Sequence, residues 1–168
     1  MPDIKDNAVA FDVARMTVLY AAWGCAVASI LHIVTIIAGP AWFDFLGAPP
    51  HYGQMMRDGD YFLPVTVTVF IAGVLAVWSA YAFCAAGVIR RLPFARLICG
   101  AVALIFILRG LFVFPLIGYV MSESAVGGVT PKSVFHIAAS LFILTLGSGF
   151  ANAVRILGPV KRGAKDNS

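Results

Sequence analysis

Four long apolar stretches constrain the fold of this chain more than any other feature of its sequence. They cover about residues 17–39, 61–89, 97–119 and 133–157. Because an α-helix rises about 1.5 Å per residue, each stretch is long enough to cross the roughly 30 Å hydrocarbon core of a bilayer. Only 12% of the residues are charged, against about 25% in an ordinary soluble domain. The sequence therefore predicts an all-α integral membrane protein built as a four-helix bundle.

The residues outside these stretches are too few for a separate soluble domain. Residues 1–168 are therefore predicted to form a single transmembrane domain, with outer loops at 40–60 and 120–132 and a basic tail at 158–168. The apolar region of a cleaved signal peptide has only about 7 to 15 residues. The first stretch is longer than this, so we expect it to be retained as a membrane helix.

Lysine and arginine residues are concentrated on one side of the predicted bundle. The loop between the second and third helices contains Arg90 and Arg91, whereas the outer loops contain only Arg57 and Lys132. Since short loops rich in basic residues remain in the cytoplasm, we expect both termini to be cytoplasmic. The net charge of +4 then reflects this asymmetry and the attraction of anionic lipid headgroups. A nucleic-acid partner is not predicted, because no basic surface is interleaved with aromatic residues.

The third apolar stretch contains a single charged residue, Arg109, near the centre of the apolar run 99–120. An arginine at the middle of a membrane costs roughly 2.5–3.5 kcal/mol on insertion scales, so it normally faces the protein interior and has a partner. Gly110 and Pro115 follow closely, and a proline within a membrane helix bends the axis and frees a carbonyl. These features predict a cavity at Arg109. The alternative is a structural arginine whose side chain extends outward to the membrane surface.

Further polar side chains occur in the outer half of the predicted bundle. His32 lies in the first helix, and His136 in the fourth helix is followed one turn later by Ser140. Because alternate helices run in opposite directions, both histidines are expected on the outer side of Arg109. We predict that these residues line a tapered polar pocket open to the outer side, in which His32 is a ligand or proton-relay group. The alternative for His32 is a neutral imidazole bonded to another helix.

The outer loop 40–60 begins with aromatic and acidic residues, including Trp42 and Asp44. Such a segment is expected at the membrane interface, where it can cover the mouth of the pocket. An ordinary belt of interfacial aromatic residues is the alternative for Trp42. No Asp or Glu lies within the apolar stretches to pair with Arg109. Its counter-charge is therefore expected to be a loop carboxylate, a carbonyl near Pro115, a lipid phosphate or an anionic ligand.

The chain contains two characteristic segments, LHIVTIIAGPAWFDFLGAPP at residues 31–50 and RGLFVFP at residues 109–115. Through these segments it resembles a group of small four-helix bacterial inner-membrane proteins without an assigned activity. The resemblance covers nearly the whole chain. It implies the four-helix architecture and a multi-pass location in a bacterial inner (plasma) membrane, and it implies no function or cofactor.

The first functional hypothesis is the binding of a small anionic or lipid-like ligand in the outer half of the bundle. In this hypothesis Arg109 binds the negative or carbonyl group, and the two histidines form hydrogen bonds to the ligand. The segment around Trp42 covers the ligand. The predicted site comprises Arg109, His32, His136, Ser140, Trp42 and Asp44.

Three alternatives remain open at this stage. The first alternative is a structural or accessory subunit of a larger membrane complex. A homo-oligomer is also possible in this interpretation, because small residues at four-residue spacing permit close helix packing. Alternatively, His32 and His136 are axial ligands of a b-type haem, or the three histidines bind a metal together with Asp44. The last alternative is an enzyme with a histidine base and Arg109 as an electrostatic stabiliser. No sequence motif specifies a reaction or identifies a cofactor.

Overall fold

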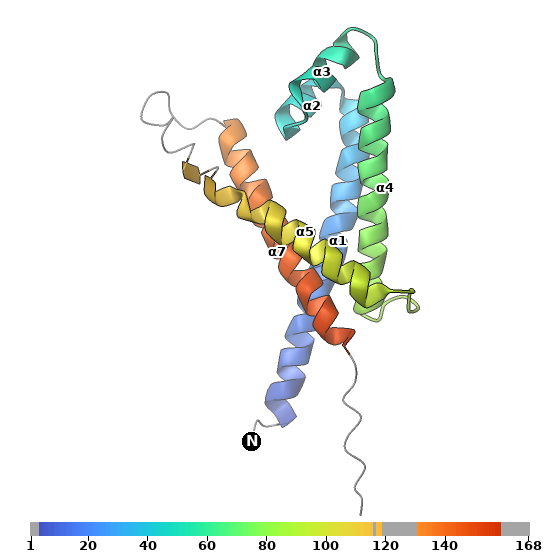
Figure 1. Cartoon of the computed structure of the whole chain (residues 1–168), viewed down its shortest axis with the longest axis vertical. Coiled ribbons are helices and arrows are strands. Elements are labelled where there is room, and N and C mark those ends of the chain that lie inside the picture. Colours follow the sequence, from blue (N-terminus) through green and yellow to red (C-terminus); the bar gives the residue numbers. More distant parts are fainter. Residues whose placement is uncertain (1–3, 116, 119–130, 159–168) are drawn as a thin grey trace, which may run out of the picture.

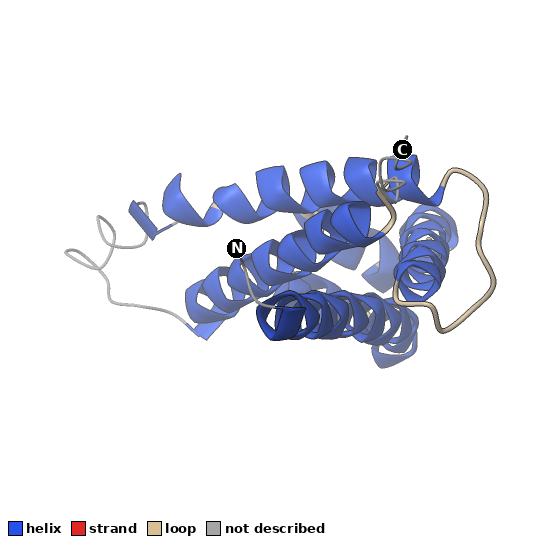
Figure 2. Cartoon of the chain, turned by 90° about the horizontal axis from the view of Figure 1, so that it is seen from below, coloured by secondary structure: helices blue, strands red, loops and turns tan. Residues whose placement is uncertain are grey.

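The structure, a computed structural model, describes residues 4–115, 117–118 and 131–158. Within these residues every regular element is a helix (Figures 1 and 2). Four helices are long and apolar enough to cross a membrane, so the chain is a multi-pass helical membrane protein. The predicted all-α class is confirmed. The elements are α1 (Ile4–Ala38), α2 (Pro40–Leu46), α3 (Pro50–Arg57), α4 (Phe62–Ala85), α5 (Ala95–Leu111) and α7 (Pro131–Ile156).

Helix α1 begins far earlier than the first apolar stretch, because the mixed apolar and acidic segment before residue 17 continues the helix. Its candidate membrane span, Asp6–Ala38, has 33 residues, which corresponds to about 50 Å of helix. This length exceeds the roughly 30 Å of bilayer hydrocarbon. The amino-terminal part of α1 accordingly projects beyond the other helices (Figure 1).

The outer loop 40–60 is more ordered than the sequence indicates, since it contains α2 and α3. Each short helix has a proline at its first position, where the missing N–H costs no helical hydrogen bond. Gly47 closes α2 in the left-handed conformation, with φ +82°, which an L side chain adopts only with strain. The proline and glycine positions therefore divide the loop into two helices.

The long helices form two antiparallel pairs, α1 with α4 and α5 with α7, and α1 also packs along α7. We use "outer end" for the end of the bundle that carries α2 and α3, and "inner end" for the opposite end, where α4 and α7 finish. The two pairs cross near the inner end and diverge toward the outer end (Figure 1). The first described residues of α1 and the end of α7 both lie at the inner end.

The hydrophobic core occupies the inner half of the bundle, where the two pairs cross. Val18, Cys25 and Phe150 are fully buried there. Phe106 of α5 contacts Trp78 and Phe150 edge to face, with ring centroids 5.3 and 5.7 Å apart. Such aromatic contacts add about 0.5–1.5 kcal/mol to the burial itself. The inner half is thus the rigid part of the molecule.

Small residues bring α7 close to its neighbours. A Cβ added at Gly149 would lie 2.5 Å from the backbone oxygen of Thr17 in α1. At Gly110 of α5 it would lie 2.7 Å from the Cβ of Leu144. Contacts of this kind permit dispersion and polar interactions between backbones, which replace the hydrophobic effect as the main cause of helix association in lipid.

Hydrogen bonds between the long helices supplement this packing. Ser29 Oγ and Ser79 Oγ donate to backbone oxygens across the α1–α4 contact, each at 2.8 Å. Asn152 Nδ2 of α7 donates to Thr17 Oγ1 of α1, also at 2.8 Å. Bonds of this kind are worth about 0.6 kcal/mol on average in a membrane protein. They set the rotation of α1 against both partners.

Candidate functional site

Arg109 is an exposed residue of α5 that is not packed against α7. Its neighbour Gly110 is buried against Leu144 of α7, and Phe106, one turn earlier, belongs to the core. Successive helical residues differ by about 100° around the axis, so the contact made by Gly110 turns Arg109 away from α7. The Arg109 side chain is exposed. The sequence predicts a cavity at Arg109, with an outward-extending arginine as the alternative, and in the structure the side chain is exposed rather than enclosed by protein.

The exposed guanidinium lies well inside an apolar span. The span Ala95–Pro115 continues for six residues beyond Arg109, which corresponds to about 9 Å of helix. Within the described residues Arg109 has no hydrogen-bond or ion-pair partner. Its immediate neighbours on the surface, Leu108 and Phe112, are also exposed. In a membrane, Arg109 therefore faces lipid, a bound molecule or another protein.

Asp44 does not supply the counter-charge of Arg109. Its Oδ2 lies 3.0 Å from Nη1 of Arg57, so the two residues form an ion pair between α2 and α3. The other acids of this loop are also engaged locally. Asp58 accepts a hydrogen bond from Gln54, and Asp60 accepts one from the N–H of Phe62. Glu123, the remaining outer-loop acid, lies outside the described residues.

The helices α2 and α3, together with the turn between them, form a cap that contacts the start of α7 through Phe45 and Gly47. A Cβ added at Gly47 would lie 2.7 Å from Cε1 of His136, so the imidazole packs directly on the glycine. Phe45 and Phe135 stack nearby, with ring centroids 4.9 Å apart. This cap covers the amino-terminal turns of α7. His136 is consequently half-buried at the junction of the cap and the bundle.

Trp42 remains at the surface of the cap, where its ring meets that of Phe45 edge to face at 6.5 Å. It is 43% exposed, which suits an aromatic side chain at the interface between lipid and water. Ser140, one turn after His136, is buried. Of the predicted outer-loop residues, Trp42 thus contacts Phe45 within the cap and Asp44 contacts Arg57 of α3.

His32 lies on α1, where its Nδ1 is 2.8 Å from the carbonyl oxygen of Ala28 one turn earlier. In a neutral imidazole this bond places the proton on Nδ1 and leaves Nε2 as an acceptor or metal ligand. The expected bond to another helix is therefore replaced by a bond within α1. The described residues contain no group of three or more His, Cys, Asp and Glu side chains that could hold a metal.

Arg109 and His136 occupy different levels of the membrane. Gly110 marks the level of Leu144 on α7, and eight residues separate Leu144 from His136, which corresponds to about 12 Å along the axis. A single anion would have to bridge this axial separation to contact both side chains. The sequence already places His136 on the outer side of Arg109, and the contact of Gly110 with Leu144 gives the separation along α7.

Comparison with models of known protein families, with curated protein sequences and with solved structures gives no significant match.

Two contacts of the site escape prediction from sequence. The Asp44–Arg57 pair joins residues 13 positions apart, and no local pattern indicates such a pairing between two short helices. The packing of Gly47 on His136 joins the outer loop to the last helix. Gly47 itself indicates that a helix ends there, since glycine commonly closes a helix in the left-handed conformation. It does not indicate which residue packs on that glycine.

Proposed function

We propose that this protein binds an anionic, lipid-like molecule in the outer half of its membrane domain, with Arg109 as the anion-binding group. The observation that carries the proposal is the exposed guanidinium within the span Ala95–Pro115, which has no partner among the described residues. An unpaired arginine is costly at this depth. An anionic oxygen that forms charge-assisted hydrogen bonds to it lowers that cost.

The position of Arg109 suggests a lateral route of entry. Because the side chain is exposed on α5 and the helix pairs diverge toward this end (Figure 1), a molecule dissolved in the bilayer reaches it from the side. The axial separation of about 12 Å between the level of Arg109 and His136 favours an elongated ligand over a small anion. His136, Ser140, His32 and the cap with Trp42 and Asp44 are proposed as its further contacts.

We further propose that the protein resides in a bacterial inner membrane with its inner end in the cytoplasm. Arg15, Arg91 and Arg155 all belong to segments at the inner end, and basic residues near membrane helices favour the cytoplasmic side. In this orientation Arg109 lies in the outer leaflet. The ligand would then be a molecule of that leaflet or of the periplasmic side.

The second candidate function is that of an accessory subunit. The same exposed arginine, flanked by the exposed apolar residues Leu108 and Phe112, suits a contact with a membrane helix of another protein that carries a carboxylate. In this case the counter-charge of Arg109 is a protein side chain. The two functions therefore predict different molecules bound at the same residue.

Native mass spectrometry of gently extracted protein tests both candidates. For ligand binding, the wild type carries a bound anionic lipid-like molecule, Arg109→Gln loses it, and Arg109→Lys keeps part of it through the retained charge. Arg90→Gln, an equal loss of charge in an exposed loop, serves as the matched control. A protein partner at fixed stoichiometry that dissociates from Arg109→Gln would establish the accessory role instead. Loss of the folded protein in Arg109→Gln would support a purely structural arginine.

A further inference from the structure

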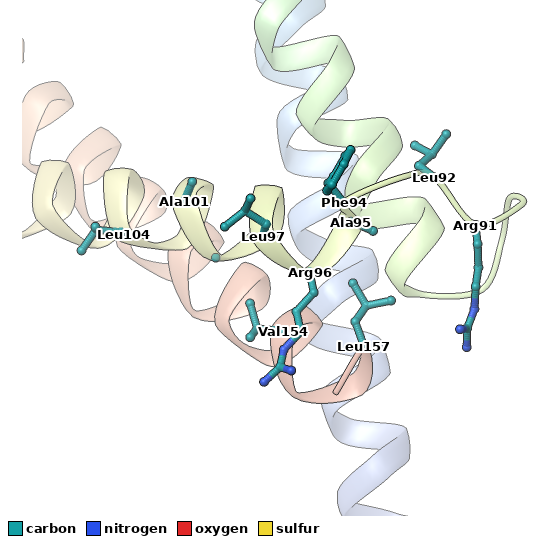
Figure 3. A pocket seen from close by; sticks show the side chains of 11 residues that line it. Arg91, Leu92, Phe94, Ala95, Arg96, Leu97, Ala101, Leu104, Val154 and Leu157 are labelled. Carbon is teal, nitrogen blue, oxygen red and sulfur yellow. The ribbon is translucent and has the colours of Figure 1, made fainter. Parts of the chain in front are cut away.

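A second feature lies at the inner end, far from Arg109. An open groove of about 760 Å³ runs along the side of α5, between the loop that follows α4 and the end of α7 (Figure 3). Its lining combines apolar side chains with two arginines. The residues that matter for its chemistry are Arg91, Arg96, Leu97, Gly100, Leu104 and Val154.

The apolar part of the groove follows one face of α5. Leu97, Ala101 and Leu104 recur at intervals of four and three residues, which places them on one side of the helix. Leu97 is 72% exposed and Leu104 is 59% exposed. The track from Leu97 to Leu104 is about 10 Å long, which is most of one leaflet of a bilayer about 30 Å thick.

Gly100 keeps this track open. A Cβ at Gly100 would stand 3.7 Å from the Val154 side chain of α7, so a larger side chain at this position would occupy the groove. The absence of a side chain leaves a shallow channel between α5 and α7. Its apolar lining suits a hydrocarbon chain.

The charged part of the groove lies at its inner end. Arg91 and Arg96 are exposed, and Figure 3 shows both side chains pointing toward the inner end of the bundle. Neither arginine has a hydrogen-bond or ion-pair partner in the part of the chain that the structure describes. No acidic residue lines the groove. The two guanidinium groups are therefore available for an anion.

Two other arginines at the inner end donate hydrogen bonds to protein groups. Arg15 Nε donates to the carbonyl oxygen of Ala86 at 3.1 Å, which satisfies a group at the end of α4. Arg155 Nη1 donates to Asn152 Oδ1 at 3.3 Å. Arg15 thus links α1 to the end of α4 and Arg155 binds within α7, whereas Arg91 and Arg96 border the groove without a partner among the described residues.

We propose that this groove is a binding site for one anionic phospholipid of the inner leaflet. An acyl chain lies along Leu97, Gly100 and Leu104, and the headgroup phosphate contacts Arg96 and is attracted by Arg91. Arginine suits this role because its planar fork forms paired hydrogen bonds to phosphate oxygens. A free phosphate ion would use only the arginines, whereas a phospholipid uses both parts of the groove. The site is independent of the ligand proposed at Arg109.

The experiment is a native mass spectrometry titration of the full-length protein in mild detergent. The probes are phosphatidylglycerol and phosphatidylcholine with identical acyl chains, and glycerol phosphate, which has no chain. We expect phosphatidylglycerol to bind at least fivefold more tightly than phosphatidylcholine, since each basic residue near a membrane surface contributes roughly a fivefold factor. Glycerol phosphate at equal concentration should not compete. Competition by it would identify a phosphate site and overturn the proposal.

Charge variants locate the headgroup. Arg91→Gln combined with Arg96→Gln should lower the affinity for phosphatidylglycerol about 25-fold. The affinity for phosphatidylcholine should fall less, because its choline cation offsets the phosphate charge. Arg90→Gln is the matched control, because Arg90 is an exposed residue of the same loop that does not line the groove. An equal loss per charge in Arg90→Gln would show general attraction by the basic loop and overturn the site.

A steric variant locates the chain. Gly100→Leu fills the groove and should weaken the binding of phosphatidylglycerol, whereas Gly73→Leu, at a helical glycine with no atom within 4 Å of an added Cβ, should not. Equal binding by wild type and Gly100→Leu would exclude the acyl-chain track. Arg91 and Arg96 are both on the surface, so we expect their variants to remain folded. A loss of binding in these variants would then report on the groove and not on unfolding.

Discussion

The imidazole of His136 at the start of α7 packs directly on Gly47, the residue that closes α2 with φ +82°. This contact joins the outer cap to the fourth membrane helix, whereas the core joins the helices only in the inner half. The cap contact therefore bridges helix pairs that otherwise diverge toward the outer end (Figure 1). We therefore expect a change at this contact to affect both the structure of the cap and the position of α7.

The first prediction concerns Gly47→Ala. Alanine in a left-handed conformation costs roughly 1–2 kcal/mol, and its Cβ would also collide with His136. We expect a lower thermal stability in detergent and faster amide hydrogen exchange in the cap. Gly59→Ala is the matched control, since Gly59 has φ +88° and open space around an added Cβ.

A double-mutant cycle separates strain from collision in this prediction. His136→Ala removes the imidazole, so Gly47→Ala in that background should cost only as much as Gly59→Ala. Independent, additive effects of the two substitutions would show that the Gly47–His136 contact does not couple the cap to α7.

The second prediction concerns the ion pair between Asp44 and Arg57. The two side chains are 40% and 47% exposed, so their coupling should be only about 0.2–1 kcal/mol. A cycle of Asp44→Asn and Arg57→Gln should measure this coupling in the free energy of unfolding. It should decrease at high salt because exposed charges are screened. A coupling that persists in molar salt would indicate that the pair is shielded from solvent.

The third prediction concerns the close approach of α1 and α7. Gly149→Ala should destabilise the bundle by about 1–3 kcal/mol, because overpacking forces backbones apart and the nearest atom is the backbone oxygen of Thr17. Gly73→Ala, in α4 with open space around an added Cβ, should leave stability unchanged or raise it slightly. Thermal unfolding in detergent compares the two variants. Equal midpoints would mean that α1 and α7 separate without cost.

The fourth prediction concerns orientation in the membrane. Asp58 at the outer end and Arg90 at the inner end are both exposed, whereas the native thiols Cys25, Cys84 and Cys99 are free and buried. A membrane-impermeant maleimide should therefore label Asp58→Cys in intact bacterial cells. Arg90→Cys should react only after permeabilisation, and the wild type should react in neither condition. The reverse pattern would place the inner end outside the cell.

Much of the architecture follows from the sequence. Backbone groups in lipid must form their hydrogen bonds internally, so an apolar run of sufficient length becomes a helix. The runs around Thr68 and Val102 accordingly correspond to α4 and α5. The sequence also indicates the proline and glycine breaks in the outer loop. It does not indicate that the loop folds into two helices, since these depend on local capping and on the contact with α7.

The sequence by itself thus determined the class of the protein, the four long apolar helices and the unusual depth of Arg109. Only the tertiary structure decided which side of each helix faces its neighbours. In a soluble protein, polar residues mark the outer face of a helix, but in lipid both faces are apolar and the periodic contrast largely disappears. Gly110 packs on Leu144 and Gly147 packs on Ile107, so these contacts set the rotation of α5 against α7. With this rotation Arg109 is exposed and does not pack against α7.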